Sequence, residues 1–573
     1  MPCLNKAVYF TLLFFLVIPP LRADDQTAAI GKETQASVIQ EKIKKEFSPE
    51  NKNNNAEVII TDETGKEKKS EVGSGGPRFY IKKIILTGSL VFSPDHFKKI
   101  TSQYENKEIT FKDLSDAADK ITQEYRTAGY LTSTAYIPEQ KITDAKAKIT
   151  IVEGKVGRYQ VESNRYFRKK QLIRYMRQEP GKIFKYPKLR EGLAGINQNP
   201  DREVRSILKK GQTPETTDII LRVKDHLPIH ANALFDNQGS RSTGQKRYGL
   251  TLRTSNTTGL DDSLAVGTIF GLHFGSVFTR YEIPVSPKYG TTLFSSFSHV
   301  QVEPKKELKD FGVNGTSENY STGLHQPLFN NRLFSLDTET SFDFKESRTK
   351  VLSGTFRRER LRILRFTHSL TARDRFGATF WEQNYGFGFD GLGASIFGDP
   401  SSARQGVEPD FFKWYGSVSR RINLFSETYL QLKTTYQLSS KKLSSSEGLY
   451  MGGASTVRGY GEGDYIADRG IYTNIEYLTP AFFIPSDLRV PYLNSPLRDQ
   501  IETVTFFDYG YGRLRGPSES EVHSRHLAGL GAGLRIHIFK NIYSRLEWAA
   551  AVGDKPLSGS GSSEFHFRVQ AEV

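Results

Sequence analysis

The chain has 573 residues, of which 37% are hydrophobic, and its mean hydropathy is -0.48. This length exceeds what one soluble domain usually needs, and beyond the extreme N-terminus no segment is apolar enough to predict a membrane-spanning helix. The net charge of +15 would suit a nucleic-acid-binding protein, but no recognisable motif of that class is present, so we expect no nucleic-acid partner. A membrane β-barrel is not excluded by low hydropathy, because only alternate residues of its strands need be apolar.

Residues 1–23 have the features of a secretory signal peptide. Lys6 precedes an apolar run that ends at Ile18, and Ala23 is the small residue at the expected cleavage point. A membrane anchor would need about 20 apolar residues, and this run is shorter. The only cysteine, Cys3, lies inside this segment, so we expect a mature chain with no disulfide, thiolate metal site or thiol nucleophile.

The next segment combines a short amphipathic pattern with a polar stretch. Ile39, Ile43 and Phe47 recur at helical spacing, which predicts a narrow apolar stripe on a helix within residues 24–48. Residues 49–77 are rich in Asn, Lys, Glu, Ser and Gly, a composition typical of a flexible linker. A disordered N-terminus stays the alternative to the helix.

Residues 78–156 follow the order strand, helix, helix, strand, strand. Ser93, which precedes a proline, and Thr110, which precedes an apolar-periodic stretch, each predict the start of a helix. Gly129 predicts where the second helix stops. The predicted strands occupy residues 79–86, 131–137 and 147–153.

A second α+β unit is predicted at residues 157–226, which leaves no room for a third before the next region. Such units can be generic domains packed for stability alone. Their sheets, however, expose an edge strand that can accept an extended segment of another chain by β-augmentation. The predicted strands are 158–162, 204–208 and 218–223, and the helical stretches lie near 168–176 and 187–196.

Residues 227–573 contain short alternating segments that recur about every twenty residues, roughly sixteen in all. In one of them Leu430 and Leu432 alternate with Gln431 and Lys433. Apolar residues outside and polar residues inside predict a transmembrane β-barrel of about 16 antiparallel strands. A soluble β-sandwich has the same alternation but would rarely need so many strands in an unbroken meander.

A glycine-rich loop at residues 441–469 lies between the eleventh and twelfth predicted strands. It carries Val457, Arg458, Gly459 and Tyr460. Because the first strand leaves the periplasm, odd-numbered strands run outward and this loop is expected on the extracellular side. An arginine in a loop of this kind can fold back into the barrel.

A later predicted strand carries a complementary charge. Phe506, Asp508 and Gly510 share one face of this strand, while Phe507 and Tyr509 share the other. If the aromatic face meets lipid, Asp508 points inward, where a guanidinium can pair with it bidentately in a geometry that lysine cannot reproduce. We therefore predict that the arginine of the loop pairs with Asp508 and anchors the loop inside the barrel.

Together these features resemble the superfamily of outer-membrane insertases and transporters with POTRA domains. Within it the chain resembles the two-partner secretion transporters of the hemolysin/adhesin secretion and activation type. The resemblance implies two periplasmic POTRA domains at 78–156 and 157–226, a pore-plugging helix within 24–48, and an infolded sixth extracellular loop. The motifs that carry it are Val457–Tyr460, Phe506–Gly510, the first hairpin from Asp236-Asn237 to Gly249, and Val152-Glu153-Gly154.

The resemblance also implies a function and partners. It implies an outer-membrane pore that recognises a large exoprotein through an N-terminal secretion domain and exports it to the cell surface. Further expected partners are outer-membrane lipid and lipopolysaccharide, and the barrel assembly machinery during biogenesis. Many outer-membrane barrels end in an aromatic residue, whereas this chain ends in Val573, so we expect Phe565 and Phe567 to serve in recognition instead.

Two alternatives differ in function class. An insertase of outer-membrane barrels shares the loop and strand motifs, but such proteins generally carry three or more POTRA units. A passive porin or uptake channel has no need of tandem periplasmic domains. The identity of the cargo stays open.

We expect no enzyme chemistry, no cofactor and no metal site. His523 and His526 lack carboxylate or cysteine partners at metal-binding spacing, and we expect them in loops. Gly529-x-Gly531-x-Gly533 alternates within a strand pattern, which predicts close approach of a loop or backbone instead of nucleotide binding. In the run from Arg357 to Arg365, Arg360 and Arg362 alternate with apolar residues and are expected to form a charged wall of the lumen.

Overall fold

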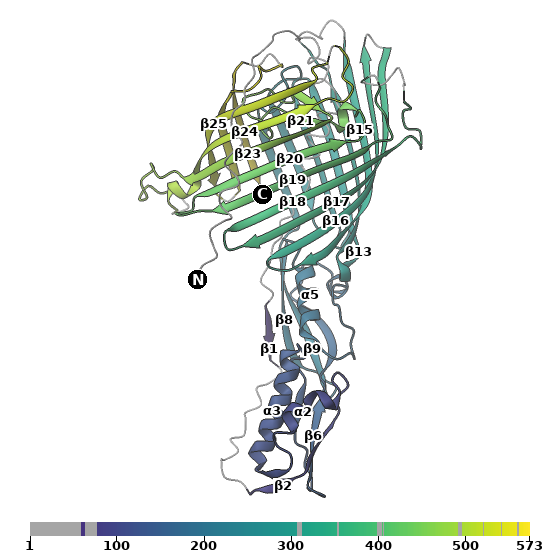
Figure 1. The fold of residues 1–573 in the computed structure, drawn as a ribbon, viewed down its shortest axis with the longest axis vertical. Coiled ribbons are helices and arrows are strands. Elements are labelled where there is room, and N and C mark those ends of the chain that lie inside the picture. Colours follow the sequence, from purple (N-terminus) through teal and green to yellow (C-terminus); the bar gives the residue numbers. More distant parts are fainter. Residues whose placement is uncertain are drawn as a thin grey trace, which may run out of the picture.

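The computed structural model describes residues 59–63, 77–305, 312–351, 354–397, 404, 406–490, 495–519, 521–539, 541–557 and 561–573. The predicted signal peptide, the predicted plug helix and most of the predicted linker lie outside the described residues. Figure 1 shows a barrel from which two small domains extend end to end as a stalk. None of the helices in the described part of the chain is long and apolar enough to cross a membrane.

The first domain of the stalk contains the predicted helices and strands in order, with one short strand, β4, that was not predicted between the two helices. Thr110 and Asp113 form a reciprocal cap at the start of its long helix, and the hydrogen bonds from Thr110 hold the pKa of the Asp113 carboxyl below its usual range. Strands β3 and β6 pair in parallel, and β5 pairs antiparallel with β6. The elements are β2 (Phe79–Ile81), β3 (Lys83–Thr87), η1 (Pro94–Phe97), α2 (Lys98–Thr101), β4 (Lys107–Ile109), α3 (Phe111–Thr127), β5 (Thr134–Tyr136) and β6 (Lys146–Val152).

Glu153, from the motif that ends the third predicted strand, is buried in this first domain. Its Oε1 atom accepts hydrogen bonds from the backbone N–H groups of Leu90 and Val91 at 2.9 and 2.8 Å, and from the Tyr125 hydroxyl at 2.7 Å. The carboxylate thus ties the loop before η1 to α3, which gives the motif a structural role.

The second domain contains a four-stranded sheet. Strands β8 and β9 pair antiparallel, and β7 pairs with β9 in parallel. The domain starts at β7, slightly before the predicted boundary, because Lys155 and Val156 already pair with β9. Its elements are β7 (Lys155–Glu162), α4 (Lys169–Ile173), α5 (Tyr186–Ile196), β8 (Arg202–Lys210) and β9 (Thr216–Asp225).

The fourth strand of that sheet comes from within the predicted linker. Strand β1 (Ile60–Asp62) pairs in parallel with β8. Ser206 N–H donates to the Ile59 carbonyl at 3.1 Å, and Glu63 N–H donates to the Leu208 carbonyl at 2.9 Å. The prediction of an uninterrupted linker at 49–77 is therefore wrong for this stretch, whose β-branched residues favour an extended strand.

Buried ion pairing holds the second domain against the barrel. Arg202 forms a bidentate pair with Asp261 of the connection between the second and third barrel strands, at 2.6 and 2.7 Å, and Tyr175 also donates to Asp261. Asp201 lies 2.7 Å from the His230 ring on the first barrel strand. These contacts join the domain to the barrel through side chains as well as through the chain itself.

Sixteen strands of the described residues form a closed barrel, as predicted. Consecutive strands pair antiparallel, and β27 closes the barrel by pairing antiparallel with β10. The strands are β10 (Ile229–Asp236), β11 (Arg247–Thr254), β12 (Ser263–Gly271), β13 (Phe274–Ser286), β14 (Thr291–Val302), β15 (Asn314–Asn330), β16 (Phe334–Val351), β17 (Gly354–Asp374), β18 (Gly377–Phe389), β19 (Phe412–Asn423), β20 (Tyr429–Ser439), β23 (Arg469–Pro480), β24 (Ile501–Arg513), β25 (Ser524–Ile538), β26 (Ile542–Ala551) and β27 (Ser563–Glu572). Two 3₁₀ turns lie in connections between barrel strands, η2 (Pro287–Tyr289) between β13 and β14 and η5 (Leu497–Gln500) between β23 and β24.

The two faces of strand β17 are the reverse of those predicted. Leu361 and Ile363 are buried inside the barrel, whereas Arg362 lies on the outer face, over the ring of Phe344, which is 40% exposed. The prediction that Arg360 and Arg362 line the lumen is wrong, because alternation fixes which residues share a face but not which face is inside.

The connection between β20 and β23, residues 440–468, folds into the barrel, and we call it loop 6. Strand β21 (Leu449–Met451) pairs antiparallel with β22 (Tyr465–Ala467), and η4 (Ser445–Glu447) precedes this hairpin. The hairpin lies within the outline of the barrel in Figure 1, where β21 is labelled. The apolar side chains of loop 6 form a core with the inner wall, made of Leu449, Met451, Val457, Tyr460, Tyr465, Ala467, Tyr472, Leu514 and Leu527.

Candidate functional site: the loop 6 lock

Arg458 at the tip of loop 6 is 1% exposed and pairs with Asp508 on β24. Its Nε lies 2.7 Å from Oδ2 and its Nη2 lies 2.7 Å from Oδ1, while the Arg458 backbone N–H donates to Oδ2 at 3.0 Å. The structure therefore brings together the two residues that the sequence paired, and the contact is bidentate. Asp508 is fully buried and faces the lumen, and Tyr509 on the opposite face is exposed.

Two further carboxylates reach the same guanidinium. Nη1 of Arg458 lies 2.7 Å from Glu476 on β23 and 3.0 Å from Glu547 on β26, and Asn474 donates to Asp508 at 2.8 Å. Sequence reasoning missed these three residues. The sequence contains a signal for Glu476, because it lies two residues beyond Asn474 on the same strand face, but only the strand register places Asn474 opposite Asp508.

The site is electrically balanced. Arg535 lies 2.6 Å from Glu476, and Arg545 lies 2.5 Å from Glu547. Buried charges are tolerated only when they are paired and hydrogen-bonded, and removing one member strands the others. Three cations thus face three carboxylates, namely Arg458, Arg535 and Arg545 against Glu476, Asp508 and Glu547.

An aromatic ring completes the seat of the guanidinium. The Cζ atom of Arg458 lies 3.4 Å from the centroid of the Phe506 ring, which is 3% exposed. A cation over an aromatic face gains electrostatic stabilisation, and more so when it is desolvated. Phe506 and Asp508, from one face of one strand, therefore bind the same group in two ways.

Glycines leave room for the loop tip. A Cβ atom at Gly529 would lie 1.9 Å from the Arg458 carbonyl oxygen, and one at Gly510 would lie 2.9 Å from Met451. Gly459 has a φ of +90°, in the left-handed region, and lies against the backbone of Ala550. The expectation that the 529–533 glycines permit close approach of a loop is confirmed at Gly529.

Val457 and Tyr460 flank this contact as buried side chains. Both are fully buried in the core of loop 6, and the Tyr460 hydroxyl accepts a hydrogen bond from the Ala528 N–H at 3.3 Å. All of the predicted loop and strand residues, Val457 to Tyr460 with Phe506, Asp508 and Gly510, thus meet at one place.

The first barrel hairpin holds a second buried pair. Arg247 lies 2.8 Å from each Asp236 oxygen, and Arg568 on β27 lies 3.0 Å from Asp236. This pair lies at the seam where β10 meets β27, so the hairpin motif of the sequence stabilises barrel closure.

The histidines singled out in the sequence lie apart from the lock. His526 is on strand β25 and not in a loop, and its ring lies 3.0 Å from the Tyr509 hydroxyl. His523 accepts a hydrogen bond from Arg513 at 3.1 Å. In the part of the chain that the structure describes, no group of three or more potential ligands is arranged to hold a metal ion.

Comparison with known proteins shows which family the chain matches. Residues 215–536 match the family model of the haemolysin secretion/activation protein ShlB/FhaC/HecB, and residues 79–154 match the ShlB-type POTRA domain. The heme/hemopexin transporter protein HuxB of Haemophilus influenzae is 23% identical over 462 residues, which cover 77% of each chain. The outer membrane transporter CdiB of Dickeya dadantii is 24% identical over 422 residues, which cover 72% of this chain and 74% of that one.

A solved structure shares the fold. CdiB from Escherichia coli superimposes with a TM-score of 0.66 at 19% identity, covering 88% of this chain and 92% of that chain. The family model spans more than half of the chain. The chain belongs to the haemolysin secretion/activation protein family ShlB/FhaC/HecB, and it is an outer-membrane transporter of two-partner secretion with periplasmic POTRA domains.

Proposed function

We propose that this transporter exports one large partner exoprotein and that the Arg458 lock holds loop 6 in the resting position. The observation that carries this proposal is that loop 6 packs an apolar core against the inner wall of the barrel and is fixed there by Arg458. A polypeptide that crosses the barrel must share the lumen with this loop. The lock therefore keeps the tip of loop 6 in a defined position beside the exported polypeptide, and export requires the tip in that position.

The stalk is the proposed receiving surface for the cargo. The second POTRA sheet already accepts an extended segment, β1, along the edge of β8. An extended stretch of the exoprotein's N-terminal secretion domain can pair in the same way, with main-chain hydrogen bonds for affinity. The segment at that edge must leave before the cargo pairs there.

A contact with lipopolysaccharide is proposed on the outer face of β16 and β17. Arg348 and Arg358 are exposed at the extracellular ends of these strands and share Glu346 at 2.6 and 2.8 Å. Arg362 lies on the same outer face, over the Phe344 ring, and this excess of cations suits an anionic glycolipid. Arg348→Gln with Arg358→Gln should reduce co-purified lipopolysaccharide by about half or more, whereas Arg421→Gln at the periplasmic end should not; equal amounts from both would refute the contact.

For biogenesis we keep the expectation that the barrel assembly machinery reads the last strand through Phe565 and Phe567. Phe565 is 52% exposed on the outer face of β27, and the Phe567 ring lies 5.1 Å from the Phe235 ring. This position on the closing strand supports the proposal.

Two rival functions make different predictions. If the protein were an insertase, many outer-membrane barrels would depend on it for assembly. If it were a porin or uptake channel, it would pass small solutes and no exoprotein would depend on it. Family membership and the POTRA match favour dedicated export over both.

The test is quantitative proteomics of the culture medium and of the outer membrane, with the gene, without it and after complementation. Dedicated export predicts loss of one large exoprotein from the medium and unchanged levels of other barrels. Broad depletion of outer-membrane barrels would identify an insertase instead. No change in either fraction would contradict export and favour the porin.

A further inference from the structure

Loop 6 has a second buried ionic contact, at its root instead of its tip. Glu447, in η4, is 1% exposed, and its carboxylate binds three cations. Lys345 Nζ lies 2.6 Å from it and Arg365 Nη2 lies 2.7 Å from it, while Lys413 donates to its other oxygen. A fully buried carboxylate with this many cationic partners is an anchor of the same kind as the Arg458 lock.

The two contacts use different parts of the wall. The root contact takes Lys345 from β16, Arg365 from β17 and Lys413 from β19. The tip contact uses β23, β24 and β26, and β20 separates the two groups of strands in the barrel. Because the two contacts draw on separate groups of strands, we expect each contact to be released without breaking the other.

The polarity of the two contacts is opposite. At the tip the loop supplies the cation and the wall supplies carboxylates, whereas at the root the loop supplies the carboxylate and the wall supplies cations. Wall carboxylates near the root are already engaged: Asp343 lies 2.6 Å from Arg365 Nε, and Glu359 accepts a hydrogen bond from Ser444 at 2.5 Å. The loop therefore fits the lumen in one orientation, since reversal would bring like charges together.

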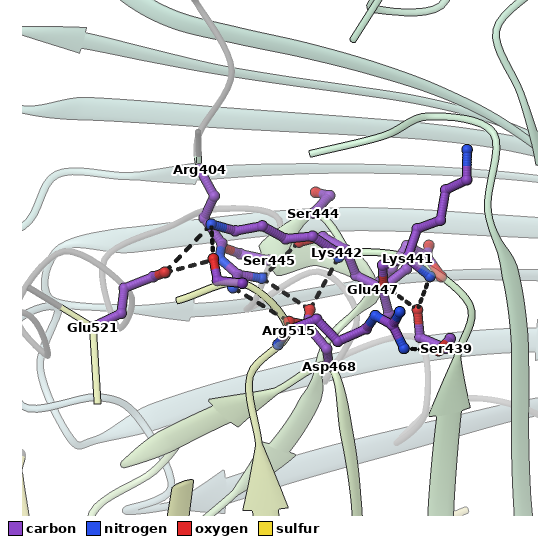
Figure 2. A network of polar contacts seen from close by, with 12 residues as sticks. Arg404, Ser439, Lys441, Lys442, Ser444, Ser445, Glu447, Asp468, Arg515 and Glu521 are labelled. Carbon is purple, nitrogen blue, oxygen red and sulfur yellow. Dashed lines mark hydrogen bonds and ion pairs between the residues drawn. The ribbon is translucent and has the colours of Figure 1, made fainter. Parts of the chain in front are cut away.

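Residues of two neighbouring connections, β18–β19 and β24–β25, contact the root of loop 6, as Figure 2 shows. Asp468, at the other end of loop 6, is fully buried and binds Arg404 of the β18–β19 connection at 2.9 Å. It also accepts backbone N–H bonds from Leu443 at 3.0 Å and from Arg515 at 2.8 Å. The Gln437 side chain donates to the backbone carbonyls of both Glu447 and Asp468, at 3.1 and 3.2 Å, so it joins the backbone at the two ends of loop 6.

We propose that Glu447 is a second anchoring residue of loop 6. It holds the root of the loop and the extracellular mouth closed, and it is released separately from the Arg458 lock at the tip. One consequence of this anchor, that the exit opens at the root of the loop, rests on the proposed export function. Glu447 acts as a positioning residue, through the cations of the wall.

The test measures how often each end of the loop becomes accessible. Ser446→Cys reports on the root and Ala454→Cys on the tip, because these side chains are 5% and 3% exposed. Thiol labelling of each reporter in the full-length protein, in outer membranes, is compared for Glu447→Gln and Arg458→Ala. Glu519→Gln, the same substitution at an exposed position of the β24–β25 connection, is the matched control. This measurement needs no cargo, so its failure is separate from a failure of the export function.

Independent anchors predict that Glu447→Gln raises the labelling rate at position 446 by about tenfold or more and leaves position 454 unchanged, because Lys345, Arg365 and Lys413 each lose a contact with a buried carboxylate. Arg458→Ala should do the reverse. Adding Lys413→Gln to Glu447→Gln should recover part of the slow labelling, since one stranded cation is removed. An equal rise at both positions, or no rise at 446 in a variant that shows the heat-modifiable migration of a folded barrel, would overturn the proposal.

Discussion

At the scale of single residues, the loss of Arg458 is expected to lower the stability of the barrel. Arg458 contacts three carboxylates, so its loss leaves buried negative charge without a partner. Stranding a buried charge costs roughly 3–5 kcal/mol. The lock therefore contributes to stability as well as to the position of loop 6.

Replacing Arg458 separates these two contributions. Arg458→Lys keeps the charge but cannot keep two parallel bonds to Asp508. We expect Arg458→Lys to lose much less barrel stability than Arg458→Ala, measured by the temperature of heat-modifiable migration, yet to export poorly. Normal export by Arg458→Ala, with the barrel inserted, would contradict a role for the lock in export.

Gly529 provides an independent test that leaves all charges in place. A Cβ atom there would lie 1.9 Å from the Arg458 carbonyl oxygen, so Gly529→Ala should displace the loop tip. We expect labelling of Ala454→Cys to rise by about tenfold, which corresponds to a loss of roughly 1.4 kcal/mol in the free energy that holds the tip against the wall. Gly275→Ala on β13, where a Cβ would meet nothing within 4 Å, is the matched control. Equal labelling in the two variants would mean that the tip is not held where the structure places it.

Much of the lock was predictable from the sequence, and the missing part has a clear cause. Period-two alternation put Asp508 opposite an aromatic face, and the loop motif supplied its cation. Glu476 and Glu547 were not predicted, because their nearness to Asp508 depends on the register of strands that are distant in sequence. The faces of β17 were assigned wrongly for the related reason that Leu361 and Ile363 face a buried loop, so the inner wall is apolar there.

At the scale of elements, helices and barrel strands were predicted well and the short strand β1 was missed. The Thr110 cap and the alternation of the barrel strands depend on residues close in sequence, so they could be predicted. Strand β1 is three residues long, and it forms only because β8 offers an edge to pair with. The β-branched residues of this stretch favour an extended conformation, but the sequence does not show which edge the strand pairs with.

Strand β1 leads to a prediction about cargo binding. Glu63→Pro removes the N–H group that donates to Leu208, worth about 1 kcal/mol, and should loosen β1 from β8. We expect full-length Glu63→Pro protein in detergent to bind the unfolded secretion domain of the exoprotein about fivefold more tightly. Glu63→Ala keeps the N–H group and should bind as the wild type does. Equal affinity of the proline and alanine variants would show that this edge does not receive the cargo.

At the scale of the whole molecule, the proposed receiving surface and the pore are joined. The Arg202–Asp261 pair and the contact between Asp201 and His230 fix the second domain of the stalk to the barrel. If the cargo binds along that domain, as proposed, it is held at the periplasmic mouth. Loop 6 is fixed in the lumen at tip and root, so the path from the stalk to the surface leads past both of its ionic contacts.

The most direct test of this account is translocation by the purified full-length chain in liposomes. The substrate is the unfolded secretion domain of the exoprotein that the proteomic comparison identifies, added on the side of the POTRA domains. The measurement is the protection of this polypeptide from added protease. We predict protected polypeptide with the wild-type chain and about tenfold less with Arg458→Ala, as expected if the lock contributes roughly 1.4 kcal/mol to the transport step. Passage of small solutes without any protected polypeptide would contradict the account and make the protein a channel.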